Sequence, residues 1–172
     1  LTCTDTIPQN VLSAVCQFIE RTYHEVGKIF QCYPRYNIPI SIEDVCQNDS
    51  PSDFPPGPPL PIWVAASYDG RIRLIYRSYS NSGPAILSTL IRHEWVHLLI
   101  DLLTHRQCPT WLDEGLAQII ARPLMHSERE CLRKASRDRQ LLNLHALKKP
   151  FSQIAAKQRR LAYLQACAIA EY

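Results

Sequence analysis

The chain has 172 residues and a mass of 19.7 kDa, the size of one ordinary domain with one hydrophobic core. Its composition is 46% hydrophobic and 20% charged, and no segment approaches the roughly 18 uncharged residues of a membrane span. The net charge of only +3 excludes a strongly acidic or basic protein as a whole. We expect a single domain over residues 1–172, and we expect it to be part of a longer chain because it begins with leucine and stops within a predicted helix.

The first half predicts a helix followed by strands. Apolar residues at spacings of three and four predict a helix over residues 8–30, with Pro8 in its first turn. Alternating isoleucines predict a half-buried strand over residues 38–42, and apolar residues alternating with arginines predict another over residues 71–77. These strands are expected to turn one face toward the core.

A proline-rich stretch separates the two alternating segments. Residues 51–61 contain six prolines around Gly57 and are expected to form an exposed loop with polyproline character. Residues 62–66 can supply a further short strand. The dipeptide Asp69-Gly70 is a strong turn signal, so we expect a hairpin between this strand and residues 71–77.

The second half predicts helices. A helical period runs from Pro84 to about Thr104, a second helix is expected over residues 111–122, a weaker one over residues 127–142 and a clearer one over residues 159–172. The order of helix, small sheet and then helices predicts the α+β class.

Seven cysteines are an odd number, and no two have the C-x-x-C spacing of a metal or redox motif. Cys16 falls among apolar helix positions and Cys167 among alanines, so we expect mostly reduced, buried thiols. Disulfides remain open for an exported chain.

Residues 93–97 have the sequence His-Glu-Trp-Val-His, which is the H-E-x-x-H pattern, in the middle of a predicted helix. Residues four apart share a helix face, so the imidazoles of His93 and His97 can point at one zinc ion. Glu94 is turned about 100° from His93, beside such an ion, where a general base for a water molecule would stand. The competing interpretation is a chance pattern, but core histidines need polar partners, which a metal supplies.

A catalytic zinc ion needs a third protein ligand and one open position. The metzincin pattern requires glycine at position 100 and histidine at position 103, and the chain has Ile100 and Leu103, which excludes that class. The remaining candidates nearby are His105, Asp113 and Glu114.

The segment WLDEGLA at residues 111–117 resembles the W-L-x-E-G-x-A segment of the gluzincin metallopeptidases. This resemblance implies that Glu114 is the third ligand of one zinc ion, although the connection from His97 is shorter than in aminopeptidase-type gluzincins. A carboxylate in the first turn of the second helix can also reach the histidines on physical grounds, or can simply stabilise the helix N-terminus.

The resemblance to a peptidase MA-like gluzincin domain covers roughly residues 62–172. The segment LAYLQA at residues 161–166, followed by Tyr172, resembles the late helix of that clan, which implies that Tyr163 stabilises an oxyanion; simple packing is the alternative. The family also implies a zincin-like fold in which residues 71–77 form an edge strand for a peptide substrate. Asp101 could support a zinc-binding histidine, or could be a solvated carboxylate.

Two features depart from the family. No G-x-M-E-N segment precedes the predicted zinc helix, since the single methionine is Met125, and this disfavours exopeptidase activity. Ala121 stands where relatives often have a glutamate that supports a zinc-binding histidine. The resemblance therefore implies a zinc-dependent endopeptidase acting on a peptide or protein, with Glu94 and Tyr163 as catalytic groups.

Two rival functions stay open. One rival is a catalytically inactive, gluzincin-like binding module. It is favoured by Ala121 and by the shorter connection between His97 and Glu114. Residues 122–160 carry a local charge of +8, which could bind phosphate backbones. However, Phe151 is the only aromatic residue between Trp111 and Tyr163, so nucleic acid is an unlikely partner.

Overall fold

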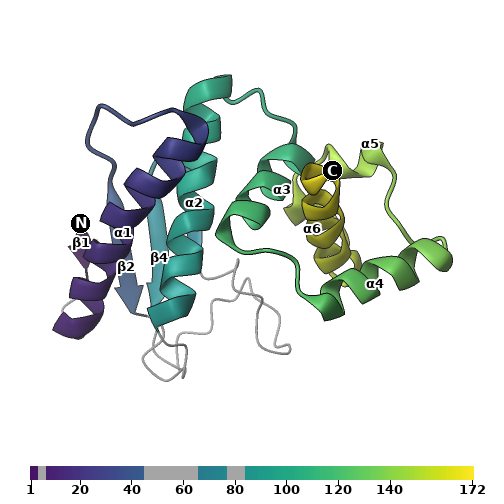
Figure 1. The fold of residues 1–172 in the computed structure, drawn as a ribbon, viewed down its shortest axis with the longest axis horizontal. Coiled ribbons are helices and arrows are strands. Elements are labelled where there is room, and N and C mark those ends of the chain that lie inside the picture. The colour runs from purple at the N-terminus through teal and green to yellow at the C-terminus, as the bar shows by residue number, and fades with distance from the viewer. Residues whose placement is uncertain (4–6, 45–65, 77–83) are drawn as a thin grey trace. The chain divides into compact units, whose positions relative to one another are not determined.

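A computed structural model of the chain describes residues 1–3, 7–44, 66–76 and 84–172. These residues form two compact units, Leu1–Leu99 and Ile100–Tyr172. Most of them are helical and a few form one small sheet, so the expected combination of helices with a small sheet is confirmed (Figure 1). The predicted proline-rich loop and most of the strand expected over residues 62–66 lie outside the described residues.

The first unit contains a mixed sheet whose strand order is β1-β2-β4-β3. Its strands are β1 (Thr2–Cys3), β2 (Ile40–Asp44), β3 (Ala66–Tyr68) and β4 (Ile72–Tyr76). β2 pairs in parallel with both β1 and β4, whereas β3 pairs antiparallel with β4. The expectation that residues 71–77 form an edge strand is therefore wrong, because β4 is paired on both sides and β3 is the strand at that edge.

A hairpin turns at Asp69-Gly70 as predicted, but its first strand is β3, Ala66–Tyr68, which overlaps the predicted strand over residues 62–66 only at Ala66. Gly70 adopts a φ of 97°, a conformation that favours glycine, and the Asp69 N–H donates a hydrogen bond to the Arg71 carbonyl at 3.2 Å. The alternation along β4 is also confirmed, because Ile72 and Leu74 are fully buried while the intervening arginine is exposed.

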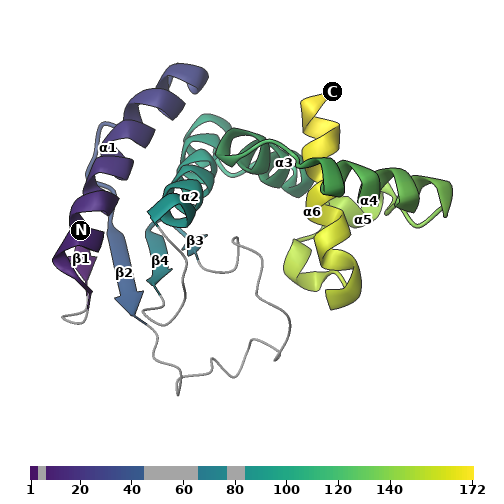
Figure 2. The same cartoon turned by 60° about the horizontal axis from the view of Figure 1, so that its bottom comes forward.

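Two long helices, α1 (Gln9–Phe30) and α2 (Pro84–Thr104), agree closely with the predicted ranges. Figures 1 and 2 show α1 and the part of α2 in the first unit on the same face of the sheet. Val15 and Val26 of α1 are fully buried. The last residues of α2 belong to the second unit, where His105 and Arg106 follow with φ values of 51° and 64°. No helix among the described residues is long and apolar enough to cross a bilayer.

The second unit is helical. Its elements are α3 (Thr110–Ala121), α4 (His126–Arg137), α5 (Leu144–Leu147), the 3-10 helix η2 (Phe151–Gln153) and α6 (Ala156–Glu171). The helix expected over residues 127–142 is thus shorter than predicted, and α5 and η2 were not expected. The most extensive packing in this unit joins α3 and α6. The core contains Leu147, Phe151, Ile154, Ala162 and Ala166.

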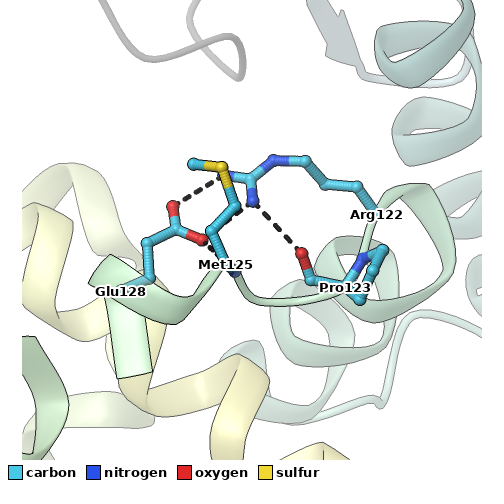
Figure 3. A network of polar contacts seen from close by, with 4 residues as sticks. All are labelled: Arg122, Pro123, Met125 and Glu128. Atoms are coloured by element: carbon cyan, nitrogen blue, oxygen red, sulfur yellow. Dashed lines mark hydrogen bonds and ion pairs between the residues drawn. The ribbon is translucent and has the colours of Figure 1, made fainter. Parts of the chain in front are cut away.

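A partly buried ion pair links the end of α3 to the start of α4 (Figure 3). The guanidinium of Arg122 donates to both carboxylate oxygens of Glu128, at 2.8 and 2.7 Å, and also to the carbonyl of Pro123 at 3.3 Å. The N–H of Met125 donates to the same carboxylate at 2.9 Å. The hydrogen bonds that Glu128 accepts from Arg122, and to a smaller extent from Met125, lower the pKa of its carboxyl group.

The six cysteines that the structure describes are all free thiols, and their burial differs from the prediction. Cys167 is buried as expected, and this burial raises its pKa to about 11. Cys16 is exposed, so its predicted burial is wrong: its neighbour Val15 occupies the buried face of α1, and the next residue turns about 100° away. Cys46 lies outside the described residues.

Candidate metal centre

α2 brings the two histidines of the H-E-x-x-H pattern into contact, with the edge of one ring toward the face of the other. Their Nε2 atoms lie 3.1 Å apart, and the ring centroids are 4.7 Å apart at an interplanar angle of 82°. His93 is only 5% exposed and His97 is half-buried. The helix therefore holds the two ring nitrogens close together, as the four-residue spacing predicted.

The separation of these nitrogens suits two ligands of one zinc ion. With bonds of about 2.0 to 2.1 Å, tetrahedral coordination places neighbouring ligand atoms about 3.3 Å apart. The same 3.1 Å distance also suits a hydrogen bond between the two rings if one Nε2 is protonated and the other is not. Metal content distinguishes these two states of the pair.

Glu114 lies on α3, which begins at Thr110, one residue earlier than predicted. The first turn of α3 therefore contains Asp113, and Glu114 follows it. The potential ligand atoms of His93, His97 and Glu114 all lie within 4.8 Å of one another, and no other such group of three occurs among the described residues.

The donor chemistry of this group fits zinc. Two imidazole nitrogens and one carboxylate oxygen form a donor set found in catalytic zinc sites, where a fourth position stays open for a water molecule or a substrate. His105 and Asp113, the other candidates for the third ligand, are not members of the group.

The remaining predicted residues lie in clearly different surroundings. Glu94 is 3% exposed on α2, beside His93. Asp101 accepts a hydrogen bond from Arg106 Nε at 3.2 Å. The ring of Tyr163 packs edge-on against Phe151, with centroids 4.9 Å apart. The roles of these three side chains in catalysis stay predictions.

Gly115 has a structural role that sequence reasoning missed. The sequence identified it only as one letter of the WLDEGLA segment, but the structure places it at the closest approach of α3 to α6, against Ala166 and Ala170. A glycine inside a helix costs about 1 kcal/mol relative to alanine, so its presence there was a signal of close packing.

Comparisons of the chain with protein-family models, curated proteins and solved structures find no match. The gluzincin resemblance therefore depends on three short segments, residues 93–97, 111–117 and 161–166.

Proposed function

We propose that the chain is a zinc-dependent peptidase of the gluzincin type, in which His93, His97 and Glu114 hold one zinc ion. The observation that carries this proposal is the 3.1 Å separation of the two histidine Nε2 atoms on a partly buried helix face. The grouping of the Glu114 carboxylate with these nitrogens supports the same conclusion. A zincin-like fold, with the sheet preceding the metal-binding helix, is part of the proposal.

The zinc ion, when bound, would act as a Lewis acid and stabilise negative charge at the scissile carbonyl. The carboxylate of Glu94 accepts a proton from the attacking water and passes it to the leaving amine. The hydroxyl of Tyr163 donates a hydrogen bond to the oxygen on which negative charge develops. The missing G-x-M-E-N segment favours cleavage within a peptide chain over removal of its first residue.

The test combines zinc content with proteolysis. The purified protein is alkylated first, because Cys3, Cys16 and Cys131 are exposed thiols that can bind zinc on their own. We expect one zinc ion per chain by elemental analysis, and cleavage of a denatured protein mixture that stops when a zinc chelator is added. One zinc ion per chain without any cleavage would favour an inactive binding module, and absence of zinc would contradict the metal site itself.

A matched pair of variants tests the ligand set. Glu114→Ala removes the proposed ligand, whereas Asp113→Ala removes the adjacent carboxylate, which is not a member of the group. We expect Glu114→Ala to lower zinc affinity and to abolish cleavage, and Asp113→Ala to retain bound zinc. Equal zinc affinity in both variants would contradict the assignment of Glu114.

A further inference from the structure

We infer that α4 separates from α6 as a unit while α3 and α6 stay packed, and that two ion pairs hold it closed over the thiol of Cys167. All the residues involved belong to the second unit, and the inference is independent of the proposed zinc site. The contact is then a conformational device that responds to salt and controls the reactivity of one thiol.

α4 adds little to the hydrophobic core of the second unit. Of its twelve residues only Glu128 and Ala135 are buried, and the core around Leu147 and Phe151 contains no residue of α4. α6 packs far more extensively on α3 than on α4. A helix with so few buried apolar contacts is among the first elements to open, at a much lower cost than global unfolding.

Two ion pairs replace the missing apolar contacts. Arg122 and Glu128 join the end of α3 to the start of α4, as described above. The guanidinium of Arg129 on α4 donates to both carboxylate oxygens of Glu171 in the last turn of α6, at 2.8 and 2.6 Å. Both side chains of this second pair are 40% exposed, so dissolved salt screens their attraction.

Cys167 lies on the face of α6 that α4 covers. Glu171 follows it by four residues and therefore shares its helix face, and Glu171 is the residue that Arg129 of α4 binds. The charges of both ion pairs act on the thiol of Cys167, which is only 1% exposed. Burial above all raises its pKa to about 11, so the thiol is uncharged in the closed state. Because the thiolate is the nucleophile, we expect Cys167 to react only after α4 separates.

Thiol labelling of the full chain under native conditions tests the inference. A short pulse of N-ethylmaleimide first blocks the exposed thiols, and peptide mass spectrometry then follows the labelling of Cys167 by iodoacetamide. Each rate is divided by that of the urea-unfolded chain. At low urea we expect this ratio to rise much less steeply with urea than global unfolding does, because a local opening exposes less surface. A ratio that follows global unfolding at every urea concentration would overturn the inference.

A matched pair of variants tests the ion pair between α4 and α6. Glu171 and Glu130 are both exposed and both bind an arginine of α4, but Glu130 binds Arg133 within α4 itself. We expect Glu171→Gln to label Cys167 about two- to fivefold faster than wild type, and Glu130→Gln to label it at the wild-type rate. Added salt should accelerate labelling more in wild type than in Glu171→Gln. Equal rates in the two variants would overturn the role of the pair.

A third variant distinguishes release of α4 from fraying of the last turn of α6, which would also expose Cys167. The hydrogen bonds of the Glu128 carboxylate come from Arg122 and Met125, neither of which lies on α6. Release of α4 therefore predicts labelling more than about 10-fold faster in Glu128→Gln, at the same weak urea dependence. Fraying predicts an unchanged rate, and this result would overturn the inference. If Glu128→Gln does not fold, Arg122→Lys takes its place, because lysine keeps the charge and loses the bidentate hydrogen bonds.

Discussion

His93 and His97 present their Nε2 atoms to each other across 3.1 Å on one helix. We predict that His97→Ala abolishes stoichiometric zinc binding, because the remaining histidine and a single carboxylate leave zinc with too few protein ligands. Elemental analysis of the alkylated protein measures this loss. The control is His105→Ala, since His105 is exposed and lies outside the metal-ligating group. One tightly bound zinc ion in His97→Ala would contradict the proposed site.

The Glu94→Gln variant should keep the zinc ion and lose activity. Glutamine has the size and shape of glutamate and fits the same buried position, but its amide cannot accept the proton of the attacking water. We expect hydrolysis to fall about 10²- to 10⁴-fold, the usual contribution of a general base. Zinc content and the rate of cleavage are measured on the same preparation, with Glu20→Gln on the exposed side of α1 as the control. Near-normal hydrolysis by Glu94→Gln would assign the base to another residue.

The Tyr163→Phe variant separates the hydroxyl group from the ring. The ring contact with Phe151 is retained in this variant, so we expect the second unit to stay folded, as measured by circular dichroism. Loss of one donor to a developing oxyanion typically lowers kcat about 10²- to 10³-fold. The kcat value of a fluorogenic peptide substrate measures the effect. A kcat equal to that of wild type would mean that Tyr163 serves only to pack the helix.

The ion pair between Arg122 and Glu128 should contribute to the stability of the second unit. Glu128→Gln leaves the partly buried guanidinium of Arg122 without its charged partner, and we expect a loss of about 2 kcal/mol in the free energy of unfolding. Urea denaturation at neutral pH measures this change. Glu130→Gln is the matched control, because its pair with Arg133 is exposed and should change the stability by less than about 0.5 kcal/mol. Equal effects of the two substitutions would contradict the prediction.

The Glu128 carboxylate also makes the free energy of unfolding depend on pH. The folded state lowers the pKa of Glu128 below its ordinary value of 4.5, so its contribution is fully present above that value. This contribution disappears as the pH falls through the lower pKa of the folded state. We expect the stability difference between wild type and Glu128→Gln to shrink between pH 7 and about pH 3, as measured by urea denaturation at each pH. A difference that stays constant or grows toward acid pH would contradict this sign.

Local sequence patterns were sufficient for the long helices and for the spacing of the histidines. α1 and α2 follow their predicted ranges closely, because many residues repeat with the helical period. By contrast, β1, α5 and η2 are too short to show any period, and they escaped prediction. The helical period also explains why the H-E-x-x-H spacing predicted two ring nitrogens close together.

Features that depend on distant parts of the chain could not be predicted. The alternation in β4 indicated a half-buried strand, but its interior place depends on the pairing of Ile40 with Ile72 across 31 intervening residues. The close packing at Gly115 depends in the same way on Ala166 and Ala170 of α6. A residue's own neighbours in sequence contain no information about which backbone will lie against it.

The end of α2 offers a route to a more heat-resistant protein. His105 and Arg106 follow one another with φ values of 51° and 64°, a left-handed conformation that costs a residue with a Cβ about 1 kcal/mol or more. Glycine adopts this conformation without that penalty, so replacing either residue should relax the turn without altering a proposed zinc ligand. The two left-handed residues at this turn therefore keep the melting temperature of the protein below the value that it could reach.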